Sequence, residues 1–529
     1  MKKVLLPTLG LATLTSAYAA KPAPQNVLFI LVDDLGWNDL SYMGSEYYES
    51  PNIDQLSCEG TVFTNAYAAC QVSSPSRASI MSGLYTTNHG ITNWIGERSG
   101  TEWRKGNRHT KLLPSEYTWQ IDPDYTLLPE LLKENGYRTF MAGKWHLGSV
   151  EESLPEGSGF DINKGGWSSG GPKGGYFSPF ENPKLEDTTP GENLEMRLAK
   201  ETVEFIKDHK KNHKKEPFFA YLSFYAVHGP IQTTEEYWSY FRDKAEAMGI
   251  AESGFECDGA LPIRQQQDNP IYAGLVKSMD DAVGYVLDHL RELGLDENTL
   301  IIFTSDNGGV VSGDNFSTNL APLRGGKGMQ YEGGIRVPLI IKNPKIKASQ
   351  GQSCDTPVIG MDYYPTIMEY ANVTIPSDVK LDGVNLTPLL EGEDIAERPL
   401  FWHYPHYGNQ GGQPSAIIRK GDWKLIYYYE DSRYELYHLA EDLSEQEHIN
   451  IQHPDKVAEL SAELHAWLKE TNAIIPTADP EYSPAAEAEV KRKWRTVTLQ
   501  EREQERKNFL SPDFEPNKTW WDSKLMIND

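Results

Sequence analysis

Two apolar segments that each end in acidic residues constrain the fold of this chain more than any other feature. Residues 26–32 (NVLFILV) run directly into two aspartates, and residues 299–304 (TLIIFT) run into the sequence Ser-Asp-Asn-Gly-Gly. Continuous runs of branched apolar residues are typical of strands that are buried on both faces of a parallel sheet. We therefore expect an α/β sheet with polar side chains at the carboxyl ends of its strands, where such sheets place their functional sites.

The length and charge of the chain narrow this expectation. With 529 residues the chain is too long for one small core, so we expect one large α/β domain followed by a smaller unit. The hydrophobic content of 39% is that of a folded globular protein. The net charge of −26 argues against binding to nucleic acids or anionic membranes, so an anionic substrate would have to meet locally clustered cations.

The first 19 residues have the pattern of a secretory signal peptide. Lys2 and Lys3 form a basic start, residues 5–14 are mostly apolar, and residues 17–19 (AYA) fit a small-residue cleavage site. The apolar stretch is too short for a membrane anchor, and we find no other segment that could span a bilayer. We expect a mature protein that works in the periplasm or outside the cell.

The four cysteines, Cys58, Cys70, Cys257 and Cys354, follow neither a disulfide-scaffold spacing nor a zinc-site spacing. Some of them could pair in an exported protein, and the sequence leaves that pairing open. Cys70 lies three residues before Ser73. The residue two positions after Cys70 is valine and not proline, so the motif described next selects Ser73.

A serine-rich segment, residues 73–83 (SSPSRASIMSG), has the pattern of a helix start. Pro75 suits the first helical turn, where a missing N–H costs nothing. Ser73 would then lie at or just before the helix N-terminus, where free N–H groups and the helix dipole favour an anion. Arg77, one turn later, could direct its guanidinium at the same anion. The pattern indicates a hydroxyl that faces a bound oxyanion, and the alternative is an ordinary serine-rich helix cap.

Acidic and amide residues follow both predicted strands, namely Asp33, Asp34, Asp306 and Asn307. Paired acids repel each other unless a cation or hydrogen bonds stabilise them. Together these oxygen atoms would form a cage that suits Ca²⁺, or less well Mg²⁺. The alternatives are a helix cap plus a solvated acid for the first pair and a simple turn for the second.

Four basic residues lie where a strand is expected to end or where glycines are dense. Lys144 and His146 follow one predicted strand (YRTFMA), His228 follows another (FFAYLSF), and Lys327 lies in the sequence RGGKG. Glycines there would let the backbone approach a ligand closely. Taken singly, each histidine or lysine could equally be structural or solvated.

The remaining patterns describe the domain organisation. Residues 271–293 have apolar side chains at helical spacing, which predicts a helix that faces the core. The later part of the chain predicts a small sheet and an amphipathic helix, with strands at 415–418, 423–428 and 434–439 and the helix at 454–469. We therefore divide the chain into a signal peptide (1–19), a main domain (20–398), a C-terminal small-sheet subdomain (399–480) and a charged extension (481–529).

In their order along the chain, these motifs resemble those of the type I sulfatases, which belong to the alkaline phosphatase superfamily. The motifs are NVLFILVDDLGWNDL, SSPSRASIMSG, GKWHLG, VHGP, FTSDNGG and GGKG followed by YEGGIRVP. The resemblance extends from residue 26 into the 430s. It implies an alkaline-phosphatase-like α/β fold, in which a large mixed, mostly parallel sheet lies between helices and a smaller α+β subdomain follows. It also implies an enzyme, a sulfuric ester hydrolase.

The resemblance further assigns roles to the candidate residues. Ser73 would be the precursor of formylglycine, made by a separate maturation enzyme that accepts serine. Ca²⁺ would be held by Asp33, Asp34, Asp306, Asn307 and an oxygen of residue 73. The sulfate pocket would be lined by Arg77, Lys144, His146, His228 and Lys327. His228 would protonate the leaving alcohol with help from Lys327, and His146 would take the remaining proton of the hydrated aldehyde.

The leaving alcohol is less clearly indicated. Cations interleaved with tryptophans would suit a sulfated sugar chain, and such a cluster comprises Trp94, Arg98, Trp103, Arg104, Lys105, Arg108, His109 and Lys111. A solvated loop is the alternative. Residues 401–407 (FWHYPHY) could form a second wall or pack at a domain junction. The acidity of the chain would suit a salt-tolerant marine protein, and a marine source favours an algal galactan such as carrageenan. Mucin sugars, glycosaminoglycan sugars and simple aryl sulfates stay open.

Two other functions stay open. A phosphoester or phosphonate hydrolase of the same superfamily is one. A two-metal phosphatase, however, needs further Asp or His ligands, which we do not find near the motifs described above. A non-catalytic protein that binds sulfated glycans through a decayed site is the other, although the set of candidate residues is complete here. The oligomeric state stays open.

Overall fold

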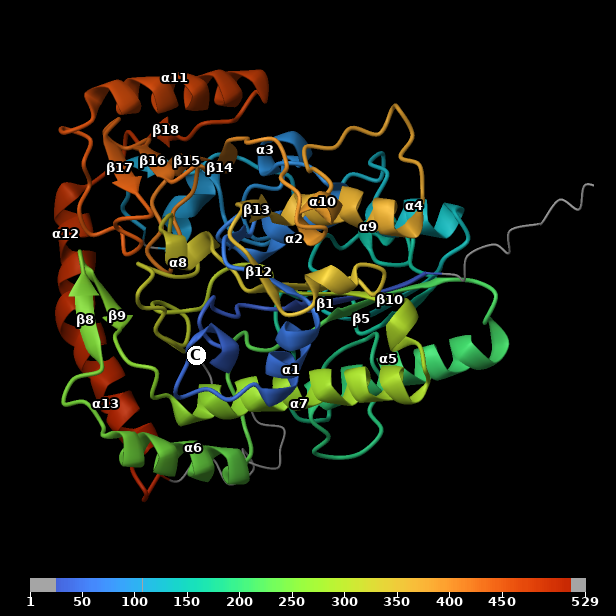
Figure 1. Cartoon of the computed structure of the whole chain (residues 1–529). Coiled ribbons are helices and arrows are strands. Elements are labelled where there is room, and N and C mark those ends of the chain that lie inside the picture. The colour runs from blue at the N-terminus through green and yellow to red at the C-terminus, as the bar shows by residue number, and fades with distance from the viewer. Residues whose placement is uncertain (1–24, 107, 515–529) are drawn as a thin grey trace, which may run out of the picture.

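An eight-stranded sheet forms the centre of the protein in the computed structural model, which describes residues 25–106 and 108–514 (Figure 1). The strand order is β12-β2-β11-β10-β1-β7-β5-β6. Five neighbouring strands run parallel, namely β10 (Thr299–Ser305), β1 (Asn26–Val32), β7 (Phe218–Ser223), β5 (Arg138–Gly143) and β6 (Ile162–Lys164). The remaining strands are β11 (Leu339–Lys342), which is antiparallel to both neighbours, β2 (Thr61–Phe63) and β12 (Gln352–Cys354). The predicted large, mixed and mostly parallel sheet is confirmed.

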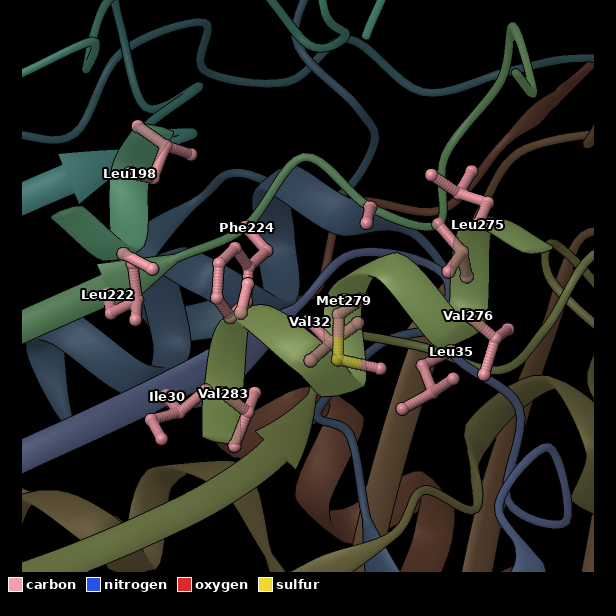
Figure 2. Close-up of a cluster of buried hydrophobic side chains, with 14 of the residues drawn as sticks. Ile30, Val32, Leu35, Leu198, Leu222, Phe224, Leu275, Val276, Met279 and Val283 are labelled. Carbon is pink, nitrogen blue, oxygen red and sulfur yellow. The ribbon is translucent and has the colours of Figure 1, made fainter. Parts of the chain in front are cut away.

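Strand β1 is buried on both faces because helices cover both sides of the sheet. Ile30 and Val32 lie in one core with Met279 and Val283 of α7, as Figure 2 shows. Phe29 belongs to the opposite core. Below the sheet in Figure 1 lie α1 (Pro51–Glu59), α5 (Leu194–Asn212) and α7 (Pro270–Glu292), and above it lie α2 (Ser73–Ser82), α4 (Leu128–Glu134) and α9 (Tyr363–Ala371). The apolar runs are continuous because neither face of these strands meets water.

The register of the parallel strands brings their carboxyl ends to one edge of the sheet. Val32 at the end of β1 pairs with Ser305 at the end of β10, and Gly143 at the end of β5 pairs with Ser223 of β7. Residues that follow these strands therefore start from the same edge. This is where the candidate residues are found.

A second, antiparallel sheet lies towards the C-terminus, with the order β14-β15-β16-β17. Its strands are β14 (Leu400–Tyr404), β15 (Ser415–Lys420), β16 (Trp423–Tyr428) and β17 (Tyr434–His438), and α11 (Pro454–Glu470) packs on them. Trp402 donates from Nε1 to the carbonyl of Ala68 over 2.8 Å, and Phe401 stacks on Trp467 of α11 at 4.7 Å. Trp402 therefore packs against the main domain and Phe401 against α11, so these two aromatic residues of segment 401–407 are core residues.

The C-terminal extension contains two helices, α12 (Pro484–Lys493) and α13 (Leu499–Leu510). Arg506 of α13 donates from Nε to Asp268 over 2.7 Å, and the carbonyl of Phe509 accepts from Trp238 of α6 (Glu235–Met248) over 3.0 Å. The extension therefore lies on the main domain. The signal peptide prediction falls outside the described residues, and the domain boundaries stay predictions.

Two other expectations concern the covalent and membrane context. None of the cysteines forms a disulfide in this structure; Cys70 is buried, Cys354 is partly buried, and Cys58 and Cys257 are exposed. Burial raises the pKa of the Cys70 thiol to about 12, which keeps it protonated. Within residues 25–106 and 108–514, no helix has both the length and the apolar character that a membrane span requires.

Candidate active site

Three buried aspartates meet where β1 and β10 end. One carboxylate oxygen from each of Asp33, Asp34 and Asp306 lies within 4.8 Å of the other two. Asn307 joins them, because its Nδ2 donates to Asp34 Oδ1 over 2.8 Å, and the backbone N–H of Asp34 donates to Asp306 Oδ1 over 3.1 Å. The four residues that the sequence singled out after these strands therefore form one cluster with an oxygen-rich donor set.

The backbone at Asp34 explains how two consecutive aspartates reach the same cluster. In an extended strand, successive side chains point to opposite faces. Asp34 instead has a φ of +62°, in the left-handed region that aspartate tolerates better than most residues. His146, after β5, has a φ of +58°. Two non-glycine residues of the site thus hold sparsely populated conformations, which is common where side chains must be aimed at a ligand.

Ser73 lies against this acidic cluster as the first residue of α2, and its side chain is buried. Its Oγ is 3.1 Å from Asp33 Oδ1 and 3.3 Å from Asn307 Oδ1, and the ammonium of Lys144 donates to it over 3.2 Å. A hydroxyl has one hydrogen to donate, so the two acceptors share it. The structure therefore places this hydroxyl at the junction of the acids and a cation.

Three cations face the three aspartates. Lys144 Nζ is 2.7 Å from Asp33 Oδ2, Lys327 Nζ is 2.7 Å from Asp34 Oδ2, and Arg77 Nε is 2.8 Å from Asp306 Oδ2. Arg77 Nη1 donates to Ser223 Oγ over 2.7 Å. Its Nη2 group is buried without a hydrogen bond and makes only a 3.5 Å ion contact with Asp33. The formal charges of the acids and cations cancel before any ligand is added.

These ion pairs oppose the effect of burial on the pKa values. Burial alone would raise the pKa of Asp33, but Lys144, His228 and Arg77 outweigh it and hold the value below its usual range. Burial lowers the pKa of Lys144, and the attraction of Asp33 only partly compensates. For Lys327 burial also acts downwards, but Asp34 outweighs it and raises the pKa. Asp33 and Lys327 are thus held in their charged forms.

The two histidines of the site differ in what their ring nitrogens contact. His146 Nε2 lies 3.0 Å from the carbonyl of Ile95, so it carries the hydrogen, and Nδ1 accepts from Ser74 Oγ over 3.2 Å. Burial, with the nearby Lys144, lowers the pKa of His146 well below its usual value, so the ring is neutral. His228 donates from Nδ1 to the carbonyl of Gly229 over 2.6 Å. Its Nε2 lies 3.8 Å from Asp34 Oδ2, and the side chain is 25% exposed, so this nitrogen can meet a ligand.

Comparison with known proteins shows the family of the chain. The sequence profile described as "Sulfatase" matches residues 25–373, which is more than half of the chain. The chain belongs to the sulfatase family. It is therefore a sulfuric ester hydrolase. A second profile, described as "N-sulphoglucosamine sulphohydrolase, C-terminal", matches residues 326–473.

Individual relatives agree with this membership. A protein of Formosa agariphila named "Sulfatase" is 31% identical, over 89% of this chain and 94% of its own length. Human N-acetylgalactosamine-6-sulfatase is 30% identical, over 72% of this chain and 69% of its own length. The crystal structure of Ps i-CgsB in complex with k-i-k-neocarrahexaose has a TM-score of 0.69 and 25% identity, and it covers 91% of this chain and 99% of that one.

The structure of this sulfatase also shows site residues that we did not predict. Ser223, the partner of Arg77, ends strand β7 and follows the same rule that selected the acids after β1 and β10. Gly170 packs on His146, since a β-carbon at position 170 would lie 2.5 Å from His146 Cε1. The following residue, Gly171, faces His228. The density of glycines in residues 165–175 was the signal that could have indicated this contact.

The basic cluster of this sulfatase is largely paired within the protein. Arg104 binds Asp479, Lys105 binds Glu102, Arg108 binds Glu97 while it stacks on Trp103, and Lys111 binds Glu430. Arg98 is exposed and has no acidic partner in the described part of the chain. The cations predicted to bind a sugar are thus mostly paired with acids of the protein itself, two of them with distant segments of the chain, and Arg98 is the one of these arginines and lysines without an acidic partner among the described residues.

Proposed function

We propose that this sulfatase hydrolyses sulfate esters of a carbohydrate in the periplasm or outside the cell, with formylglycine made from Ser73 by a maturation enzyme and with Ca²⁺ as cofactor. The position of Ser73 Oγ carries the proposal, because it contacts Asp33, Asn307 and Lys144 at once. An ordinary helix-capping serine would contact backbone N–H groups of its own helix instead. The predicted signal peptide supports the location.

The residues present fit a calcium ion. Three buried carboxylates and the Asn307 side-chain carbonyl offer the hard oxygen ligands that Ca²⁺ prefers, and Asp33, Asp34, Asp306, Asn307 and residue 73 would hold it. When bound, Ca²⁺ supplies positive charge that stabilises developing negative charge at sulfate and at residue 73. Formylglycine supplies, as its hydrate, one hydroxyl that attacks sulfur and a second whose deprotonation releases sulfate.

Arg77, Lys144 and Lys327 bind and orient the sulfate group in this proposal. Their charges balance those of the three aspartates, so a divalent cation would leave the pocket with a surplus of positive charge that attracts an anionic ester. The Arg77 Nη2 group, which is buried without a hydrogen bond, is a donor available to a sulfate oxygen. All three side chains are buried, so they act where water screens them little.

His228 is the proposed general acid for the leaving alcohol. Its Nδ1 hydrogen is used on Gly229, so the proton that it delivers would be carried on Nε2, where Asp34 at 3.8 Å stabilises the charged ring. His146 is the proposed acceptor of the last proton from residue 73. The His146 ring is neutral, and its Nδ1 accepts a hydrogen bond from the Ser74 hydroxyl. To take a proton from residue 73, Nδ1 needs the Ser74 hydroxyl either to rotate away or to relay that proton.

The substrate class that we propose is a sulfated sugar of galacto configuration, with an algal galactan such as carrageenan as its finer form. Two relatives support this: one is named for N-acetylgalactosamine, and the other was solved with neocarrahexaose. A phosphate or phosphonate ester hydrolase of the same superfamily is the competing function. A non-catalytic glycan-binding protein is disfavoured by the complete set of paired site residues.

The test uses full-length protein co-expressed with a maturation enzyme that accepts serine. Sulfate release is measured from galactose monosulfates, N-acetylgalactosamine monosulfates, carrageenan oligosaccharides and an aryl sulfate, with phosphate and phosphonate monoesters in parallel. The proposal predicts sulfate release from at least one sugar and none from the Ser73→Ala variant. Hydrolysis of phosphate or phosphonate esters without sulfate release would instead establish the competing function, and binding without turnover would establish a glycan-binding protein.

A further inference from the structure

A polar cluster beside Lys327 takes no part in the chemistry proposed above. Asn409 donates from Nδ2 to Asp314 Oδ1 over 2.9 Å, and Gln410 donates from Nε2 to Asp314 Oδ2 over 2.7 Å. Asp314 lies on the loop after β10, whereas Asn409 and Gln410 lie on the loop between β14 and β15 of the C-terminal sheet. Two segments far apart in the sequence thus build one hydrogen-bonded group.

This cluster lies at the Lys327 side of the candidate active site. Gln410 packs on the neighbour of Lys327, because a β-carbon at Gly328 would lie 2.7 Å from Gln410 Oε1. Lys327 itself donates its backbone N–H to the carbonyl of Gly309 over 2.8 Å, and Gly309 lies five residues before Asp314 on the same loop. Burial acts to lower the pKa of Lys327, but the negative charges of Asp34 and, next, of Asp314 outweigh it and raise the pKa. Asp314 is therefore near enough to attract the Lys327 ammonium group.

The cluster has acceptor atoms that remain free for a ligand. Asp314 is half-buried, and each of its oxygens accepts one hydrogen bond although a carboxylate oxygen can accept two. Asn409 is exposed, and its Oδ1 has no hydrogen-bond partner within the described residues. The left-handed backbone of Gly313 and Asp314, with φ values of +65° and +39°, fixes the turn that presents the carboxylate.

We propose that Asp314 and Asn409 bind a free hydroxyl group of the sugar ring beside the sulfate ester, and thereby select a ring with no second sulfate at that position. The inference rests on the proposed function, in which Lys327 binds the sulfate group and His228 protonates the leaving oxygen. The sugar must then continue past Lys327, where a carboxylate accepts a hydroxyl hydrogen but repels a sulfate. Lys327 cannot compensate for a second sulfate, because in the proposed function it already serves both Asp34, at 2.7 Å, and the sulfate group that is to be released.

The test compares a galactose monosulfate with the same sugar carrying a second sulfate on the neighbouring carbon. Asp314→Asn keeps an oxygen acceptor but removes the charge. We compare kcat/KM for the monosulfated sugar with kcat/KM for the disulfated sugar. The variant should lower this ratio by at least about tenfold, because the repulsion between the carboxylate and the second sulfate is removed. Asn409→Ala should raise KM for the monosulfated sugar by about fivefold or more while kcat changes less, because a hydroxyl contact is lost.

The control is Asp394→Asn, the same charge change at an exposed aspartate between α10 (Thr387–Leu390) and β14. This variant should keep the wild-type ratio. A ratio for Asp314→Asn within twofold of wild type, with Asn409→Ala unchanged in KM, would overturn the inference. An unmutated, matured protein that releases sulfate from no ester would instead contradict the proposed function, so the two failures are distinguishable.

Discussion

The ammonium group of Lys144 lies 2.7 Å from Oδ2 of Asp33, and both side chains are buried. The same ammonium group donates to Ser73 Oγ over 3.2 Å. One buried cation therefore connects the proposed nucleophile with the proposed metal site. Because burial already lowers the pKa of Lys144, its charge depends on the acid beside it.

Replacing Lys144 by methionine keeps most of the side-chain volume and removes the charge. We expect kcat/KM for an aryl sulfate to fall by roughly 10²- to 10³-fold, because a fixed charge is lost where negative charge develops. The measurement is steady-state kinetics of the matured variant, with the exposed Lys211→Met as the matched control. Activity of Lys144→Met within threefold of wild type would contradict the role.

Replacing His228 by alanine tests the proposed general acid through the leaving group. A sugar alcohol leaves poorly without a proton, whereas an acidic phenol leaves without help. We expect a loss of roughly 10²- to 10⁴-fold in kcat on a sugar sulfate and a much smaller loss on a nitrophenyl sulfate. The measurement is steady-state kinetics of the variant on both substrates, with the exposed His448→Ala as control. Equal losses on both would assign His228 to sulfate binding instead of proton transfer.

Removal of calcium should abolish activity without unfolding the protein. The three site aspartates each retain a cation partner within 2.8 Å, so no uncompensated acid is left behind. We expect chelated protein to lose activity and to melt at a lower temperature, and added Ca²⁺ at about 100 times its Kd to restore about 2.7 kcal/mol of stability. Activity that survives chelation, in protein shown by elemental analysis to lack calcium, would exclude this cofactor.

Glu195 should make the stability of the protein depend on pH. Burial raises the pKa of Glu195 to about 8, although the N–H of Ala226 donates to the carboxylate over 3.0 Å. The folded state therefore holds a proton that the unfolded chain, with the ordinary pKa of 4.5, releases. Stability from this group is full below pH 4.5, is lost as pH rises towards 8, and levels off above it.

The variant Glu195→Gln has no such proton to release. We compare the free energy of unfolding of the variant with that of the wild type. The difference should shift in favour of the variant by roughly 3 to 5 kcal/mol between pH 4.5 and pH 8. Urea unfolding at pH 5, 6.5 and 8 measures the difference. A constant difference across these three values would show that Glu195 is ionised in the folded protein.

Local sequence pattern predicted the central strands well. The apolar run at residues 26–32 coincides with β1, and the run at 299–304 falls one residue short of β10 (Thr299–Ser305). Both strands are buried on each face and are followed directly by aspartates, so the change from apolar to charged residues marks where they end. The short strands β2 and β12 carry no such signal, because their pairing is set by contacts far along the chain.

The sequence allowed us to predict which residues form the candidate site, but not how their side chains contact one another. Strand-end position selected the acids, and only the family resemblance joined them to Ser73 and Lys327. The pairing of Arg104 with Asp479 spans 375 positions, so no local pattern could show that this cation is already neutralised. The same holds for Asp314 and Asn409, which meet only because the C-terminal sheet packs against the main domain.

The state of residue 73 tests the central claim most directly. Intact and peptide mass spectrometry should be applied to protein from its native host, with a chymotryptic fragment covering residues 68–84. We expect this fragment to be about two mass units lighter than the mass calculated from its sequence, because oxidation of the Ser73 alcohol to an aldehyde creates the nucleophile. Unmodified serine in every molecule, in protein that still hydrolyses sulfate esters, would contradict it.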